Sequence, residues 1–219
     1  GATLDLASMA DLSGGLTVRD AGEEVTLGEL GATTPGALTV TQAQADVVFD
    51  GDLTATTVTL TDAAGDFLFG STHTVDITTG LTTTAEDYGI SVFSTDFDAA
   101  GATTFLNTGT VTLGSLISND LTFAGGLTAN APGTVVFGVG TVSLSTTNGA
   151  LSLGDADPEA VRVLGNASLS TGTGSIDLTD TVLADGASLT VGDGSAAAIN
   201  MDAIAGTDAG GASDLTFNT

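Results

Sequence analysis

The sequence predicts an all-β protein folded as a parallel β-helix, or β-solenoid, of about nine or ten coils. Short triplets of apolar, polar and apolar residues recur along the 219 residues, and glycine-containing pairs separate them. No segment keeps apolar residues at helical spacing for three turns. Most triplets begin roughly 7 to 11 residues after the one before, which is typical of an all-β fold.

The expected strands share one pattern: the outer two residues are mostly Val, Leu, Ile or Phe, and the middle one is usually Thr or Ser. Because side chains alternate across a strand, each triplet has one buried face and one face in water. We therefore expect an outer wall rich in hydroxyl groups. The strand cores are residues 16–18, 25–27, 38–40, 47–49, 58–60, 67–69, 75–77, 90–92, 111–113, 121–123, 135–137, 142–144, 151–153, 161–163, 167–169, 176–178, 189–191, 199–201 and 215–217.

Two segments also suit a helix, residues 4–12 and 196–205, although "LDL" at 4–6 fits a strand. Residues 1–15 are a candidate N-terminal cap of a single solenoid domain spanning residues 1–219. A β-sandwich built from repeats is the alternative fold. A sandwich would close within about 100 residues and would usually contain a buried aromatic anchor. Here the triplets continue to the last residues, and Tyr88 is the one aromatic residue besides phenylalanine.

Charge excludes several classes of partner. The net charge is −25, with Arg19 and Arg162 as the only lysine or arginine residues. Such a chain lacks the electrostatic attraction on which nucleic-acid binding depends, and an anionic membrane surface would repel it. It has no run of 18 apolar residues, so we expect no membrane insertion.

Few residues could support catalysis. His73 could act as a general base beside Ser71 and Asp76, but a surface turn is the simpler interpretation. Paired carboxylates are common, as a glycosidase would need, yet the chain has no tryptophan on which a sugar ring could stack. We expect no enzyme, and a polysaccharide-acting parallel β-helix is the least favoured alternative.

Calcium is the more reasonable inorganic partner, because closely spaced Asp residues in turns supply the six to eight oxygen ligands that it takes. The sequence contains neither the EF-hand loop nor the glycine-rich calcium-binding nonapeptide. No other cofactor is expected. The candidate metal ligands are Asp155, Asp157 and Glu159 in "DADPE" and Asp96 and Asp98 in "STDFD", followed by Asp50 and Asp52 in "FDGDL".

Threonine pairs suggest a third function, since flat ladders of threonine on a β-solenoid can order water against ice. Thr-x-Thr runs stand at residues 54–56, 57–59, 108–110 and 171–173. An ice-binding face needs one such motif per coil, in register, and the spacing of these runs is irregular. Threonine is also simply favoured on the exposed side of a strand.

The stretches "LTVTQAQADVVFDGDLTATTVTLTD", "LNTGTVTLGSLISNDLTFAGGLTA" and "GASDLTFNT" resemble coils of filamentous-haemagglutinin-like and autotransporter-type bacterial surface proteins and of giant repeat adhesins. The resemblance implies a right-handed parallel β-helix exported to the cell surface, which serves as a stiff stalk or adhesive fibre. It transfers no individual residue as a binding residue.

These observations together predict a structural or adhesive extracellular rod, either a stalk segment of a surface adhesin or a self-stacking subunit of a filament. The expected partner is a second copy at either end, or further coils of a longer repeat array. A surface or glycan ligand is also compatible with this role, and the residues that would bind it are unknown.

Overall fold

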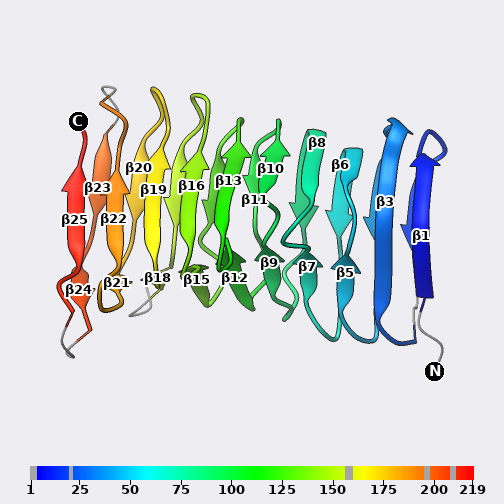
Figure 1. The fold of residues 1–219 in the computed structure, drawn as a ribbon, viewed down its shortest axis with the longest axis horizontal. Helices are drawn as coiled ribbons and strands as arrows, with labels where there is room; N and C mark the ends of the chain where they lie inside the picture. The colour runs from blue at the N-terminus through cyan, green and yellow to red at the C-terminus, as the bar shows by residue number, and fades with distance from the viewer. Residues whose placement is uncertain (1–3, 20–21, 156–159, 195–197, 208–210) are drawn as a thin grey trace.

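The computed structural model describes residues 4–19, 22–155, 160–194, 198–207 and 211–219. Within these residues the chain forms twenty-five β-strands and no helix. All pairings between the strands are parallel, and each coil lies on the one before it, which gives a β-solenoid of about nine turns. The prediction of a parallel β-helix is confirmed. In Figure 1 the strands stack along the long axis, with the two termini at opposite ends.

Three stacks of strands make up the coils, and we call them faces A, B and C in the order in which the chain passes through them. Face A consists of β1 (Leu4–Asp11), β3 (Val25–Thr34), β5 (Val47–Phe49), β7 (Phe67–Phe69), β9 (Ile90–Val92), β12 (Thr110–Leu113), β15 (Thr134–Phe137), β18 (Val161–Val163), β21 (Thr181–Leu183) and β24 (Ile204–Gly206).

Faces B and C continue each coil. Face B consists of the second halves of β1 and β3 and of β6 (Leu53–Leu60), β8 (Thr74–Thr83), β10 (Asp96–Ala99), β13 (Ser118–Phe123), β16 (Thr141–Ser145), β19 (Asn166–Ser170), β22 (Ser188–Val191) and β25 (Asp214–Phe217). Face C consists of β2 (Leu16–Val18), β4 (Ala37–Val40), the second halves of β6 and β8, β11 (Thr103–Thr104), β14 (Leu127–Ala129), β17 (Leu151–Leu153), β20 (Ile176–Leu178) and β23 (Ile199–Met201).

Coil length varies, which explains why the sequence has no strict period. Val47 lies opposite Phe67, twenty residues on, whereas Val135 lies opposite Val161, twenty-six residues on. The difference arises largely at the corner between faces B and C. Strand β6 runs through that corner without a turn, but β16 and β17 are joined by residues 146–150. The strands stay in register because the turns absorb the extra residues.

The core is one continuous column of inward-facing side chains. In most inner strands the first and third residues of each triplet are fully buried and the middle one is not. Phenylalanine rings continue the packing from coil to coil: Phe49 stacks on Phe69 with centroids 4.5 Å apart, and Phe69 meets Phe97 edge-on at 5.5 Å. Phe97 in turn packs on Phe123 at 5.3 Å. Each coil therefore covers the apolar surface of the next.

Several sequence-based expectations need correction. Residues 4–12 do not form a helix, because Leu4–Asp11 pairs with β3 as the first strand of the stack. In the second helical candidate, 196–205, residues 199–201 form β23 and residues 204–205 begin β24, while residues 196 and 197 lie outside the described residues. The sandwich alternative is wrong, because strands pair in parallel with the next coil. A capping role for residues 1–15 stays a prediction.

Among the described residues, no helix has the length and apolar character needed to cross a membrane.

Candidate functional site

Face B brings together acidic residues that are far apart in the sequence. On β10, Asp96 and Asp98 both lie on the outer side of the strand. Strand β8 places Asp76 opposite Asp98, and β13 places Asp120 opposite Asp96. Neighbouring strands are about 4.8 Å apart, so the four carboxylates form a compact group, the face B acidic cluster. The sequence predicted only the Asp96 and Asp98 pair.

Burial and the charge of this cluster both affect the pKa of Asp98. Partial burial raises the pKa of Asp98 above its usual range, and the neighbouring charge of Asp96 raises it further. A hydrogen bond with Thr122 acts in the opposite direction, while Asp76 and Asp120 add smaller repulsions. No cation is among the groups that shift this pKa. The charged groups that affect Asp98 are therefore all carboxylates.

Replacing Asp98 with asparagine should stabilise the protein at neutral pH, because it removes one of the repelling carboxylates. We expect a gain of a few tenths of a kcal/mol in the free energy of unfolding, since solvent screens this partly exposed group. A pKa that is raised on folding contributes stability that is complete below the unfolded pKa and is lost as pH rises through the folded pKa. Stability of the native chain should therefore increase as pH falls towards the acid range, and Asp98→Asn should weaken this increase.

Denaturant titrations at several pH values would measure this effect, with the distant exposed Asp5→Asn as the matched control. If Asp98→Asn and Asp5→Asn had the same effect at every pH, the proposed repulsion at Asp98 would be wrong.

The calcium prediction remains open. In the part of the chain that the structure describes, no group of three or more His, Asp or Glu side chains is arranged to hold a metal ion. Asp157 and Glu159 lie outside the described residues, while Asp155 is half-buried. A calcium site at "DADPE" or at Asp96 and Asp98 therefore stays a prediction.

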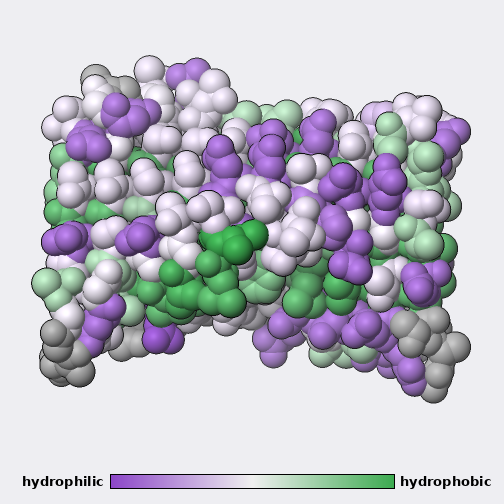
Figure 2. Space-filling view, in the orientation of Figure 1, coloured by the Kyte–Doolittle hydropathy of each residue, from purple (hydrophilic) through white to green (hydrophobic). Residues whose placement is uncertain are grey.

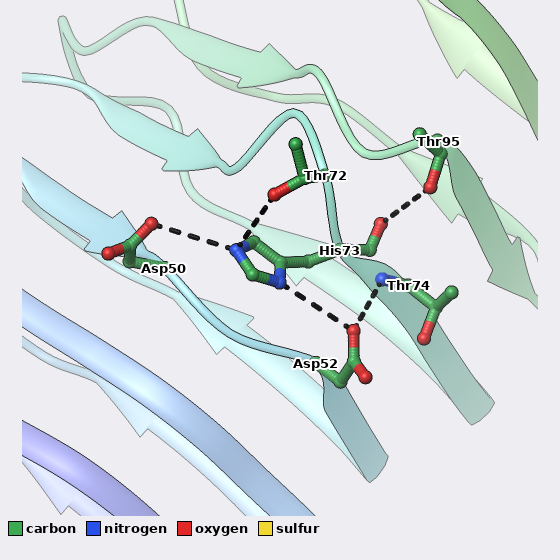
Figure 3. A network of polar contacts seen from close by, with 6 residues as sticks. All are labelled: Asp50, Asp52, Thr72, His73, Thr74 and Thr95. Carbon is green, nitrogen blue, oxygen red and sulfur yellow. Dashed lines mark hydrogen bonds and ion pairs between the residues drawn. The ribbon is translucent and has the colours of Figure 1, made fainter.

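His73 lies in the turn between β7 and β8, beside carboxylates of the previous coil (Figure 3). Its Nε2 is 3.7 Å from Asp50 Oδ1, and its Nδ1 is 3.7 Å from Asp52 Oδ1. Thr72 Oγ1 lies 3.2 Å from Nε2. Asp52 also accepts a hydrogen bond of 2.9 Å from the Thr74 amide. The structure thus gives the His73 ring contacts with Asp50 and Asp52 that join two coils.

An apolar groove of about 480 Å³ lies at the corner between faces A and B. Its main apolar lining residues are Phe93, Leu116, Ile117 and Val139. Leu116 is 81 % exposed and Val139 is 53 % exposed, which is unusual for side chains of this size. Figure 2 shows the apolar patch over β12 and β15, with hydrophilic residues on the face B strands above it. We call this feature the corner groove.

Sequence reasoning missed the corner groove because residues 114–117 lie between the predicted strand cores 111–113 and 121–123 and no role was assigned to them. A signal was present, however. The turn in "LGSLISND" contains two adjacent large apolar residues, Leu116 and Ile117, where the other turns are mostly Gly, Asp, Asn, Ser or Thr.

Face C carries a second unpredicted feature, a column of threonines on its outer side. Six coils in succession place a threonine at the same position, and the column continues as Ser152, Asp177 and Asn200. Of the Thr-x-Thr runs chosen from the sequence, only residues 57–59 contribute to it. The members of this threonine column are Thr17, Thr39, Thr59, Thr82, Thr104 and Thr128.

Comparison of the chain with protein-family models, curated proteins and solved structures finds no match. The solenoid fold therefore rests on the structure itself, and the resemblance to bacterial surface proteins stays a prediction. Four surfaces are candidates for a function: the two ends of the stack, the threonine column of face C, and the corner groove beside the face B acidic cluster.

Proposed function

We propose that this chain is a rod-like structural segment of an extracellular surface protein, as part of an adhesin stalk or as a subunit of a filament. The observation that carries the proposal is that apolar side chains of the core column are exposed in the outermost coils. Leu215 and Phe217 continue the inward column of Leu189 and Val191, with which they pair directly. Leu189 and Val191 are at most 1 % exposed, whereas Leu215 is 38 % and Phe217 is 49 % exposed.

The opposite end has the same character. Leu4 is 38 % exposed, although Val25, its partner in the next coil, is completely buried. Open strand edges and exposed core residues favour pairing with another strand. A further coil at either end, from the same chain or from a second copy, would cover these side chains in the way that interior coils do.

The regular coils between the ends suit a mechanical role. The ten strands of face A, stacked at about 4.8 Å, give a body roughly 43 Å long. Its outer wall consists mainly of threonine, serine and aspartate, and the chain has no lysine or cysteine. Such a wall is soluble and chemically inert, which supports an extracellular rod, in agreement with the resemblance stated above.

Electron microscopy at rising protein concentration would test the proposal. We expect particles that lengthen by end-to-end addition, because each contact buries the exposed apolar ends. The double variant Leu215→Asp with Phe217→Asp should remain as single short rods. Leu106→Asp is the matched control, since Leu106 is 42 % exposed but lies on the side of the rod. Single rods for the native chain at every concentration would contradict self-stacking.

A second candidate function is ice binding, and the threonine column of face C favours it. Six in-register threonines on a parallel sheet present hydroxyl and methyl groups at one strand spacing. Inhibition of ice recrystallisation by the purified chain would test this function. Activity that is lost in Thr82→Tyr but kept in Thr26→Tyr, which lies on face A, would support it. Absence of activity in the native chain would exclude it.

A further inference from the structure

We propose that the corner groove and the face B acidic cluster together form a docking site for a cationic, amphipathic peptide segment of a partner protein. Apolar side chains of the partner would occupy the groove, and its lysine or arginine side chains would lie over the carboxylates. The site is on the side of the rod, so the proposal does not depend on stacking at the ends.

The apolar half of the site is an exception on this surface. Among the residues described, the outer wall of interior coils exposes few large apolar side chains, and Leu116, Ile117 and Val139 gather at one corner. Exposed apolar groups that cluster in this way commonly mark an interaction site. The volume of about 480 Å³ lies within the range of roughly 300–1,000 Å³ that is typical of ligand sites.

The groove is held in place by a buried side chain. Asn119 is 2 % exposed. Its amide nitrogen donates to the carbonyls of Phe93 and Ser94, at 2.8 and 2.7 Å. Its Oδ1 accepts a hydrogen bond of 2.9 Å from the Ser115 amide. Asn119 thus ties the turn that carries Leu116 and Ile117 to the Phe93 wall in the previous coil. A groove that is already formed loses less entropy when a partner binds.

The carboxylates of the charged half of the site come shortly after the groove-lining residues in the sequence. Asp96 lies three residues after Phe93, and Asp120 lies three residues after Ile117. The two aspartates are direct partners on neighbouring strands. The strands that begin beside the groove therefore carry the acidic cluster, in which Asp96 pairs with Asp120 and Asp98 pairs with Asp76. A cation placed here would lie next to several carboxylates and offset their charge.

Charge also determines which kind of partner the site would bind. A second copy would bring another net charge of −25, so its side-by-side approach is opposed by repulsion. Nucleic acid is opposed for the same reason. A neutral apolar segment would fill the groove without using the carboxylates. A segment that carries both apolar and basic side chains complements both halves, and charge complementarity also accelerates its association.

A binding experiment with defined peptides would test the site. The probe is a short, fluorescently labelled peptide of alternating leucine and lysine, measured by fluorescence anisotropy with the full chain. Two matched peptides replace either every lysine with glutamate or every leucine with serine. We expect the leucine–lysine peptide to bind, with an affinity that falls as the salt concentration rises. Each matched peptide should bind at least about tenfold more weakly.

Variants then locate the site on the chain. Leu116→Ser with Ile117→Ser removes the exposed apolar wall, and Asp96→Asn with Asp120→Asn removes charge without changing shape. Each double variant should raise Kd about tenfold or more, whereas Leu106→Ser and Asp5→Asn, on other parts of the surface, should leave it unchanged. All these side chains are exposed, so the variants should fold.

Three results would overturn the proposal. One is equal binding of the lysine–serine and lysine–leucine peptides, which would indicate general attraction to an acidic protein. Another is equal loss of affinity in the groove variants and their controls. The third is no measurable binding of the leucine–lysine peptide at low salt.

Discussion

Replacing Phe97 with alanine should lower the free energy of unfolding by about 3–5 kcal/mol, the usual cost of removing a buried phenylalanine. Phe97 is completely buried and packs between Phe69 in the previous coil and Phe123 in the next. Its loss would leave a cavity at the junction of three coils, which the strand pairing on either side prevents from closing. Guanidinium denaturation followed by circular dichroism would measure the change.

Leu116→Ala is the matched control for Phe97→Ala. Leu116 is 81 % exposed, so its replacement should change the free energy of unfolding by less than about 0.5 kcal/mol. Similar effects of the two substitutions would mean that the phenylalanine column does not form a packed core.

Gly51→Ala should lower the free energy of unfolding by about 1–3 kcal/mol, the usual effect of overpacking a closely fitted interior. A Cβ atom at Gly51 would meet the backbone of Gly28 and Glu29 in the previous coil, and backbone atoms of a paired coil cannot move aside independently. The close approach of the coils at this corner therefore requires glycine. Thermal denaturation of the variant would measure the loss as a lower Tm.

Gly80→Ala provides the comparison, because a Cβ atom there has no neighbour within 4 Å. Gly80 lies in β8 and pairs with Thr57. Alanine in a strand loses less conformational entropy on folding than glycine, so this variant should be neutral or slightly more stable. A loss of stability at Gly80 as large as that at Gly51 would contradict the close approach of neighbouring coils as the cause.

The fold could be predicted from the sequence because the apolar triplets are local signals. An apolar–polar–apolar triplet such as residues 151–153 both indicates a strand and fixes which side is buried, and the structure shows Leu151 and Leu153 buried around a half-buried Ser152. Helix candidates at 4–12 and 196–205 failed for the opposite reason. These segments contain alanine and methionine, which suit a helix locally, but pairing with a neighbouring coil decides their structure.

The surface features were harder to predict because they depend on pairing between coils. Asp96 and Asp98 are close in sequence and were found, but Asp76 and Asp120 join them only through the register of β8, β10 and β13. The threonine column was missed for the same reason. Successive members are separated by twenty to twenty-four residues, as Thr39 and Thr59 or Thr104 and Thr128 show. An irregular period of this kind cannot be aligned without the lengths of the turns.

The register of successive coils determines where the acidic cluster, the threonine column and the corner groove lie. Since the chain has no cysteine, pairs of cysteines can be introduced without interference. Thr59 and Thr82 are direct partners, at about the strand spacing of 4.8 Å, and a disulfide accepts Cα separations of about 4.4–6.8 Å.

The measurement is therefore the extent of disulfide formation, under mild oxidation, in Thr59→Cys with Thr82→Cys and in Thr59→Cys with Thr104→Cys. The first pair joins neighbouring coils and should cross-link within one chain. The second pair is two coils apart, roughly twice the strand spacing, and should remain reduced. Cross-linking of the second pair, or its absence in the first, would contradict this register of successive coils.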